Sequence, residues 1–399
     1  MHKRKQYLDR LIAAKDTDYV KLLVGVRRSG KSTLLELMKQ HLLENDVLEE
    51  QILFINFEMA KNDELRNSKD LHNYVESFIK TSQKTYLFLD EVQEINEWAK
   101  VVNSLRVSYN IDIYATGSNA RVFVGEHLTY LAGRYMTIYV YPLSYYELLE
   151  FINEKENFEG HYNTFLESSF PSVVLEKNEI NKKQIQEDIF KTIFERDIIL
   201  RGKINKEREF FAIARYLLEH IGTQISANKI YHAMRSNGIN ISYDSVSHYL
   251  DLMVKSYFLY ECNRYDLKGK EELKTLSKYY VVDFGIRNEL VPNTDSNRGR
   301  VLENFVYLEL IKQGYKVYSG KIGRNYEIDF IAIKNNEKIY IQVTESLIDP
   351  DTRERESRVF RELNDNYSRF IISLDTIDYT TSMFKHLSLF QFLKVINNK

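Results

Sequence analysis

A glycine-rich segment near the amino terminus has the residue types and the spacing of a phosphate-binding loop. Residues 25–32, GVRRSGKS, fit the pattern G-x-x-x-x-G-K-[ST], with an apolar run before them and a helical pattern after them. Glycines at two positions let the backbone turn and bring its N–H groups against phosphate oxygens. The lysine would place its charge on the β and γ oxygens, and the serine could offer its hydroxyl to Mg²⁺. The residues expected to bind the nucleotide are Gly25, Arg28, Ser29, Gly30, Lys31, Ser32 and Thr33.

Two adjacent carboxylates, Asp90 and Glu91, follow the apolar run YLFL at residues 86–89. Such a run predicts a buried strand, and ligands of open α/β sheets bind at the carboxyl ends of strands. We expect Asp90 and Ser32 to hold Mg²⁺, and Glu91 to orient or deprotonate the attacking water. A strand that simply ends in a solvated charge pair is the alternative, but the phosphate-binding loop upstream favours the catalytic interpretation.

A further strand-like run, residues 111–115, ends in small polar residues. A side chain at this point could position the water beside the γ-phosphate. Asn119 is the first choice for that role and Ser118 the second, and the alternative is a turn that merely caps the strand.

The first third of the chain alternates between strand and helix signals, and these elements would position the candidate residues. Residues 21–26 are expected to form a buried strand, and residues 32–44 an amphipathic helix. Helical stretches separate three more strand-like runs, which are residues 51–58, 85–93 and 110–118. This spacing predicts crossover helices and a parallel, doubly wound α/β sheet.

Length and composition limit the classes of protein that remain. A chain of 399 residues with 44% apolar residues can hold two or three packed domains. The net charge of −2 removes overall basicity as an argument for nucleic-acid binding, so such a site has to be a local patch. The single Cys262 excludes an intramolecular disulfide, and a buried, inert thiol is expected. No secretory signal or membrane-spanning run is recognised, which predicts a cytoplasmic protein.

The middle of the chain is predominantly helical. Helical periodicity begins after Pro142, and three helix-length segments follow at residues 209–222, 227–238 and 243–262. A hairpin around residues 268–270 completes the outline of a winged helix, whose third helix would enter a DNA major groove. That helix carries two aspartates and little positive charge, so a protein-packing role stays an equal alternative.

The motifs of the first third, in their order, resemble those of AAA-type ATPases of bacteria and archaea that carry a winged helix and a restriction-endonuclease-like domain. The resemblance covers nearly the whole chain and implies an AAA+ fold that binds ATP with Mg²⁺. It also implies that Arg134 acts as an arginine finger in trans within a homo-oligomer, and that Glu58 faces the nucleotide; Arg134 as an ordinary surface charge is the alternative. The motifs that carry it are GVRRSGKSTLL, INFE, LFLDEVQ with the following Trp98, TGSNAR, LAGRY and PLSYYELL.

The same resemblance implies three domains. Residues 1–200 would form the AAA+ ATPase domain, with a helical extension from about residue 142. Residues 201–292 would form the winged-helix domain, and residues 293–399 a small α/β restriction-endonuclease-like domain, separate from the rest.

In that last region Glu303, Asp329 and Gln342 resemble the PD-(D/E)xK nuclease pattern. In that pattern acidic residues and a lysine hold Mg²⁺ and activate water. Here Gln342 stands where an acid is usual and Thr344 where the lysine is usual, although Lys321 could have taken over that charge. Glu303 and Asp329 remain placed to hold one cation. We expect a degenerate module that binds DNA or partners, with an active nuclease as the alternative.

These features favour a Mg²⁺-dependent ATP-hydrolysing protein that acts on DNA or a DNA-associated partner. A nucleotide-dependent, oligomerising signalling or defence switch and an ATP-gated nuclease are the alternatives. Adenine is favoured over guanine because no Asn-Lys-x-Asp motif is found where small GTPases place it.

Overall fold

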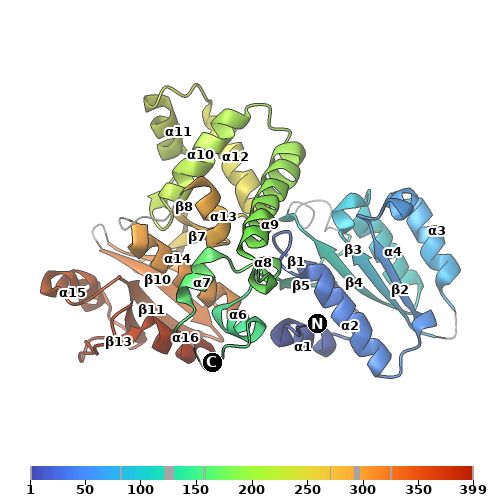
Figure 1. Cartoon of the computed structure of the whole chain (residues 1–399), viewed down its shortest axis with the longest axis horizontal. Coiled ribbons are helices and arrows are strands. Elements are labelled where there is room, and N and C mark those ends of the chain that lie inside the picture. Colours follow the sequence, from blue (N-terminus) through green and yellow to red (C-terminus); the bar gives the residue numbers. More distant parts are fainter. Residues whose placement is uncertain are drawn as a thin grey trace.

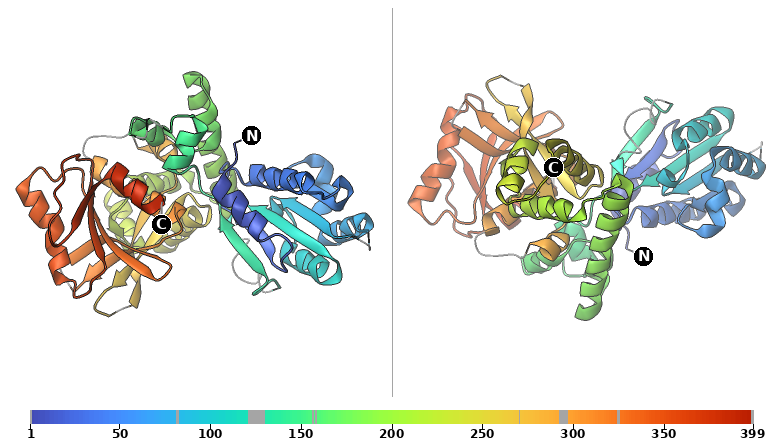
Figure 2. Two further views of the ribbon diagram at one scale, coloured as in Figure 1. Left: turned by 90° about the horizontal axis from the view of Figure 1, so that it is seen from below. Right: turned by 90° about the horizontal axis from the view of Figure 1, so that it is seen from above.

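The structure is a computed structural model that describes residues 2–80, 83–120, 130–155, 157, 159–269, 271–291, 297–323 and 326–397. Figure 1 shows a sheet with its helices from the first third of the chain, a second sheet towards the C-terminus, and a group of helices from the middle. Both views of Figure 2 place the two sheets on opposite sides of the molecule.

The N-terminal sheet has five parallel strands in the order β2-β3-β4-β1-β5. This confirms the predicted parallel α/β sheet and adds β5, which the apolar runs did not predict. The strands are β1 (Val20–Val24), β2 (Ile52–Asn56), β3 (Thr85–Asp90), β4 (Ile111–Gly117) and β5 (Tyr135–Tyr139). The helices of this part are α1 (Lys5–Ala13), α2 (Lys31–Glu44), α3 (Ser68–Phe78) and α4 (Trp98–Ser108), with 3-10 turns at Glu49–Gln51, Ala60–Arg66 and Val92–Glu94.

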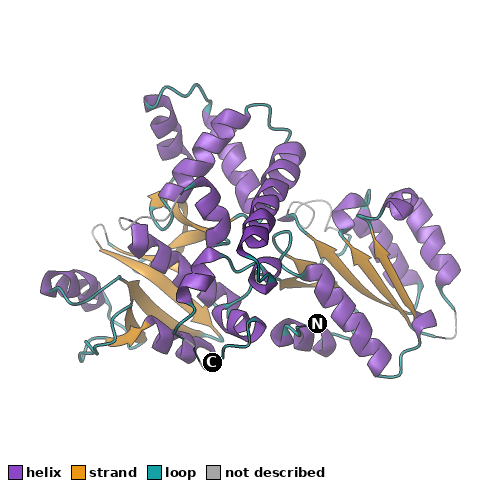
Figure 3. Cartoon of the chain, in the orientation of Figure 1, coloured by secondary structure: helices purple, strands orange, loops and turns teal. Residues whose placement is uncertain are grey.

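Helices cover both faces of this sheet (Figure 3), and strand β3 shows why its sequence is continuously apolar. Successive side chains of a strand point to opposite faces. Leu87 and Leu89 therefore join one apolar cluster, together with residues of α3 and α4. Tyr86 and Phe88 join another, together with residues of α1 and α2.

The middle of the chain forms helices and an antiparallel hairpin. The helix predicted over residues 243–262 is too long: it ends at Lys255, because Tyr257 takes the left-handed conformation (φ +59°) and the chain continues as a strand. The hairpin is present, but its Lys270 lies outside the described residues. The elements are α6 (Tyr145–Phe151), α7 (Tyr162–Glu167), α8 (Pro171–Leu175), α9 (Glu179–Lys191), the π-helix η5 (Thr192–Leu200), α10 (Glu207–Glu219), β6 (Gln224–Ile225), α11 (Ala227–Ser236), α12 (Tyr243–Lys255), β7 (Leu259–Asp266) and β8 (Glu271–Val281).

The second sheet has eight strands in the order β13-β12-β11-β10-β9-β7-β8-β6. It is continuous across the boundary expected at residues 292 and 293, because β9 pairs in parallel with β7. The C-terminal strands and the hairpin of the middle region thus share one sheet. The elements are α13 (Phe284–Leu290), α14 (Arg298–Lys312), β9 (Lys316–Ile322), β10 (Tyr326–Lys334), β11 (Glu337–Val343), α15 (Pro350–Ser357), a 3-10 turn (Arg358–Glu362), β12 (Ser368–Ser373), β13 (Lys385–Ser388) and α16 (Leu389–Asn397).

Side-chain packing also crosses the boundary expected near residue 200. Tyr145 of α6 and Phe165 of α7 lie in one apolar cluster with Phe305 of α14. The division into three domains, and the winged-helix and restriction-endonuclease-like assignments, stay predictions. Cys262 is buried, as expected, and burial raises the pKa of its thiol. No helix among the described residues combines the length and the apolar character needed to cross a membrane.

Candidate nucleotide-binding site

The loop between β1 and α2 needs glycine at both of the expected positions. Gly25 has φ +150°, and a Cβ atom built on it would lie 2.1 Å from the carbonyl oxygen of Val140. Gly30, at the amino end of α2, has φ +97°. A side chain at Gly25 would collide with backbone, and one at Gly30 would be strained, so the local sequence fixes the shape of this loop.

Lys31 is buried, and its ammonium lies against its own loop. Its Nζ donates hydrogen bonds of 3.0 Å to the carbonyl oxygens of Gly25 and Val26. Burial lowers the pKa of Lys31, and the nearby charge of Glu91 opposes that shift. The Ser29 hydroxyl is also buried, without a hydrogen-bond partner among the described residues. A polyphosphate would offer acceptors to both groups, so the loop fits the ligand that the sequence predicts.

Asp90, at the end of β3, faces the loop. The Ser32 hydroxyl donates to its Oδ1 (3.0 Å), and the side chains of Asn56 and Thr116 donate to its two oxygens. Burial raises the pKa of Asp90, which the hydrogen bonds from Thr116 and Ser32 oppose. The structure thus brings Ser32 and Asp90 together, as the sequence predicts for the two residues that would hold Mg²⁺.

Glu91 is held beside them in a contrasting environment. Its carboxylate accepts hydrogen bonds from Gln93 and from the Ser118 hydroxyl (3.1 Å). Burial alone would raise the pKa of Glu91, but the positive charges of Lys31 and Arg27 outweigh it and hold the pKa below its usual value. Adjacent carboxylates with pKa values shifted in opposite directions suit different chemical roles.

The residues after β4 reach the same edge of the sheet. Asn119, the first choice for positioning the water, is buried two residues beyond the end of β4. Ser118, the second choice, donates a hydrogen bond to the Glu91 carboxylate.

A pocket of about 660 Å³ opens over the loop. Glu58 lines this pocket and forms ion pairs with Arg27 and with Arg196 (3.1 Å). The residues that line the pocket are Arg27, Arg28, Gly30, Lys31, Ser32, Thr33, Glu58, Glu91, Pro171, Ser172, Leu175, Thr192 and Arg196.

Helix α8 and the π-helix η5 supply the part of this pocket that the sequence did not predict. Thr192 and Arg196 lie on η5, and Asp197 of the same helix accepts a hydrogen bond from Arg27 Nε (2.9 Å). No motif pointed to these residues, because η5 follows the sheet by more than fifty positions and meets the loop only through folding.

Arg134 lies elsewhere. It is exposed and directly precedes β5, whose first residue, Tyr135, pairs with Val20 at the start of β1. The loop follows the other end of β1, so the length of a five-residue strand, at about 3.3 Å per residue, separates Arg134 from its own pocket.

Glu303, Asp329 and Gln342 come together in another pocket, of about 560 Å³, which the loop residues do not line. The lysine beside them is Lys278 of β8, and Lys321 does not line this pocket.

Comparisons with known proteins agree with this geometry. The model of an AAA domain matches residues 17–149, and the model of a domain of unknown function, DUF8612, matches residues 161–297. An uncharacterized protein of Haemophilus influenzae is 36% identical over 380 residues, which cover 94% of this chain and 93% of that protein. An uncharacterized protein of Methanocaldococcus jannaschii is 28% identical over 387 residues, or 93% of this chain and 84% of its own.

Among solved structures, a Walker-type ATPase of Pyrococcus abyssi has a TM-score of 0.49 and 15% identity, and the match covers 73% of this chain and 96% of that one. The Orc1 protein of Aeropyrum pernix, solved in complex with DNA, has a TM-score of 0.33 and 10% identity over 73% of this chain and 92% of its own. The phosphate-binding loop and the five-stranded parallel sheet lie within the matched AAA domain. The chain therefore has an AAA domain and belongs to the same family as the Haemophilus influenzae relative.

Proposed function

We propose that this protein binds ATP with Mg²⁺ and hydrolyses it in the pocket over residues 25–33, and that it uses the cycle to move its later regions on a nucleic-acid or protein partner. The observation that carries the proposal is the meeting of Lys31 and Ser32 with Asp90 and Glu91 at one edge of the sheet. The loop supplies the groups that would bind phosphate, and the end of β3 supplies the carboxylates that would hold Mg²⁺ and activate water.

Each residue has a distinct role. Lys31 exchanges the carbonyl oxygens of Gly25 and Val26 for phosphate oxygens, which are stronger acceptors because they are charged. Ser32 and Asp90 would hold Mg²⁺, which supplies neutralisation of phosphate charge when bound. Glu91 stays ionised and accepts a proton, or a hydrogen bond, from the attacking water.

Two substitutions separate binding from hydrolysis. Lys31→Ala should lower ATP affinity by roughly 100-fold, because charge-assisted hydrogen bonds contribute about 1.5–3 kcal/mol each. Glu91→Gln should keep ATP affinity and lower turnover by about 10²- to 10⁴-fold, the usual contribution of a general base. Nucleotide titration and phosphate release measure the two effects, and Lys39→Ala on the same helix is the control. Unchanged turnover in Glu91→Gln would refute its assignment.

The partner is tested with ATPase rates in the presence of duplex DNA, single-stranded DNA and RNA. Salt-sensitive stimulation by one of them supports a nucleic-acid partner. If none of the three nucleic acids changes the ATPase rate, and the protein forms oligomers when a non-hydrolysable ATP analogue is bound, the signalling switch is favoured instead.

A further inference from the structure

A buried lysine, Lys278, is among the residues that line the 560 Å³ pocket beside Glu303 and Asp329. Lys278 of β8 is 4% exposed, and its Nζ donates hydrogen bonds to Glu303 of α14 (2.9 Å) and Asp329 of β10 (3.2 Å). Glu327 forms a third ion pair with it, at 3.1 Å. The proposed ATPase chemistry uses none of these groups.

The backbone brings these side chains together from distant segments. Lys278 pairs with Cys262 in the hairpin, so it lies on the sheet face against which α14 packs. Strand β10 has a register shift between Ile328 and Ile331, and Asp329 lies within it. Such irregularities change the direction of a side chain, and here Asp329 of β10 meets the lysine of β8, three places away in the sheet.

The ammonium is firmly held as a cation. Burial would lower the pKa of Lys278, but Glu303, Asp329 and Glu327 raise it well above its usual value. Burial also raises the pKa of Glu303 to about 7, against the opposing charge of Lys278. The Tyr280 hydroxyl donates a further hydrogen bond, of 2.6 Å, to Glu303.

The remaining polar groups beside Lys278 form hydrogen bonds within the chain. Asp329 uses its second oxygen to accept from the backbone N–H of Val343 (2.9 Å). Gln342 accepts from the backbone N–H of Asp329 (2.8 Å) and donates to Glu356 (2.9 Å). No group of three or more His, Cys, Asp or Glu side chains in the described part of the chain is placed to hold a metal ion. The cation implied by the nuclease-like pattern therefore does not fit the residues as arranged.

We propose that the ammonium group of Lys278 takes the place of a divalent cation between Glu303 and Asp329. The ion pairs of Lys278 connect β8 with α14 and β10 without a metal ion. A lysine cation satisfies the carboxylates permanently, whereas Mg²⁺ would have to be captured from solution and shed its water. The C-terminal region then has no metal-dependent nuclease activity.

The proposal predicts a latent metal site. Removing the ammonium leaves the partly buried Glu303 and Asp329 without the cation that bridges them, which is unfavourable. A divalent cation with a preference for oxygen ligands is the natural replacement. Lys278→Met should therefore bind a cation that the unaltered chain does not bind.

The probe is Mn²⁺ alone, titrated without nucleotide. Every variant keeps the same phosphate-binding loop, so any Mn²⁺ bound there cancels in the comparison. Lys278→Met should bind one Mn²⁺ more per chain than the unaltered protein, and its melting temperature should rise with Mn²⁺. Lys278→Met/Asp329→Asn should lose this extra site, and Lys268→Met, an exposed lysine of the same hairpin, should not gain it.

Two results overturn the proposal. One is a Lys278→Met protein that gains no Mn²⁺ site. The other is an Asp329→Asn protein that binds less Mn²⁺ than the unaltered chain, which would show a metal site in the presence of Lys278. If Lys278→Met is insoluble, added Mn²⁺ should restore a cooperatively folded protein, and failure of that rescue also counts against the proposal. ATP binding plays no part in these outcomes.

Discussion

At the scale of single residues, the phosphate-binding loop depends on a side chain outside its motif. Arg4 is buried behind the loop, where it donates 2.8 Å hydrogen bonds to the carbonyl oxygens of Ser29 and Tyr141. Its guanidinium also forms a two-point ion pair with Glu147 of α6. Arg4 thus fixes the back of the loop, so we assign it a positioning role without contact to the nucleotide.

Arg4→Lys tests this role while it keeps the charge beside Glu147. A single ammonium cannot reproduce the planar fork that serves Glu147 and two carbonyl oxygens together. We expect ATP affinity to fall by roughly tenfold, which corresponds to about 1.4 kcal/mol or one to two hydrogen bonds. Titration with a fluorescent ATP analogue measures it, and Arg10→Lys, exposed on helix α1, which directly follows Arg4, is the control. A lower melting temperature with unchanged ATP affinity would mean that Arg4 only stabilises the fold.

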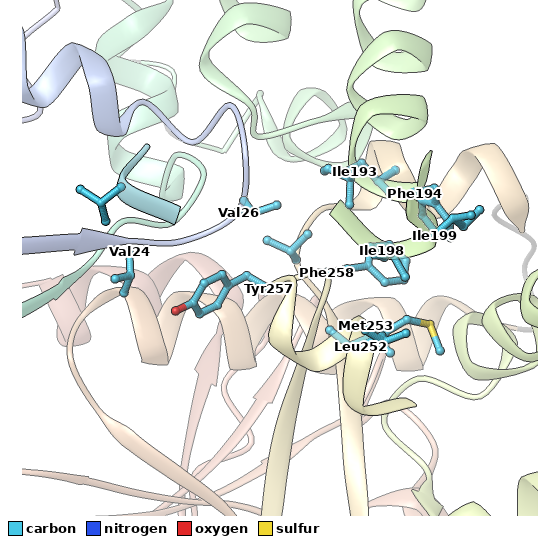
Figure 4. Packing of buried hydrophobic residues seen from close by; sticks show 14 of the residues in the cluster. Val24, Val26, Ile193, Phe194, Ile198, Ile199, Leu252, Met253, Tyr257 and Phe258 are labelled. Atoms are coloured by element: carbon cyan, nitrogen blue, oxygen red, sulfur yellow. The ribbon is translucent and has the colours of Figure 1, made fainter. Parts of the chain in front are cut away.

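At the scale of elements, the π-helix η5 links the nucleotide pocket to the middle of the chain. Figure 4 shows Ile193, Phe194 and Ile198 of this helix near Val26 of the loop and Phe258, which follows α12. The rings of Phe194 and Phe258 meet edge to face, with centroids 4.8 Å apart. π-helical turns are rare and are frequent at functional sites. The π-helix η5 therefore contributes to the candidate phosphate site and also packs in the apolar cluster that contains Val26 and Phe258.

Arg196 on this helix offers the sharpest test, because it lines the pocket and is half exposed there. When ATP binds, its guanidinium can leave Glu58 for the phosphates, since both partners are anionic acceptors. Arg196→Ala should lower ATP turnover at least tenfold, measured by phosphate release. Arg215→Ala, on the exposed surface of α10, should change nothing. Equal rates in the two variants would exclude η5 from the reaction.

At the scale of the whole molecule, the position of Arg134 determines whether this residue can reach a nucleotide pocket of its own chain or only that of a second copy. The residue lies at the amino ends of β1 and β5, whereas the pocket lies at the carboxyl ends. A catalytic role for Arg134 therefore needs a second copy of the chain, as the resemblance implies.

Mixing two inactive variants tests that assembly. Lys31→Ala lacks the phosphate grip and keeps Arg134, and Arg134→Ala keeps the grip and lacks the arginine. If the arginine acts in trans, a mixture should recover ATP turnover that neither variant has alone, whereas Lys100→Ala, exposed on α4, should be active by itself. Full turnover in Arg134→Ala alone would instead identify it as an ordinary surface charge.

The sequence by itself determined the phosphate-binding loop, the carboxylates after β3 and the parallel arrangement of the strands around them. These features are local: consecutive residues set the turns, and hydrophobic periodicity sets strands and helices. Because parallel strands present their carboxyl ends at one edge, the meeting of Ser32 and Asp90 followed without any knowledge of packing. Strand β5 was not predicted, because its side chains are only partly buried and its sequence gives no continuous apolar run.

Only the tertiary structure decided which distant segments complete the two pockets. Asp197 lies 170 positions from Arg27, and Lys278 lies 51 positions from Asp329. No spacing rule links such pairs, because their meeting depends on which helix and sheet faces bury against each other. The same reason explains why the predicted boundary at residue 293 falls within a continuous sheet: the pairing of β7 with β9 is long-range, and the local pattern does not encode it.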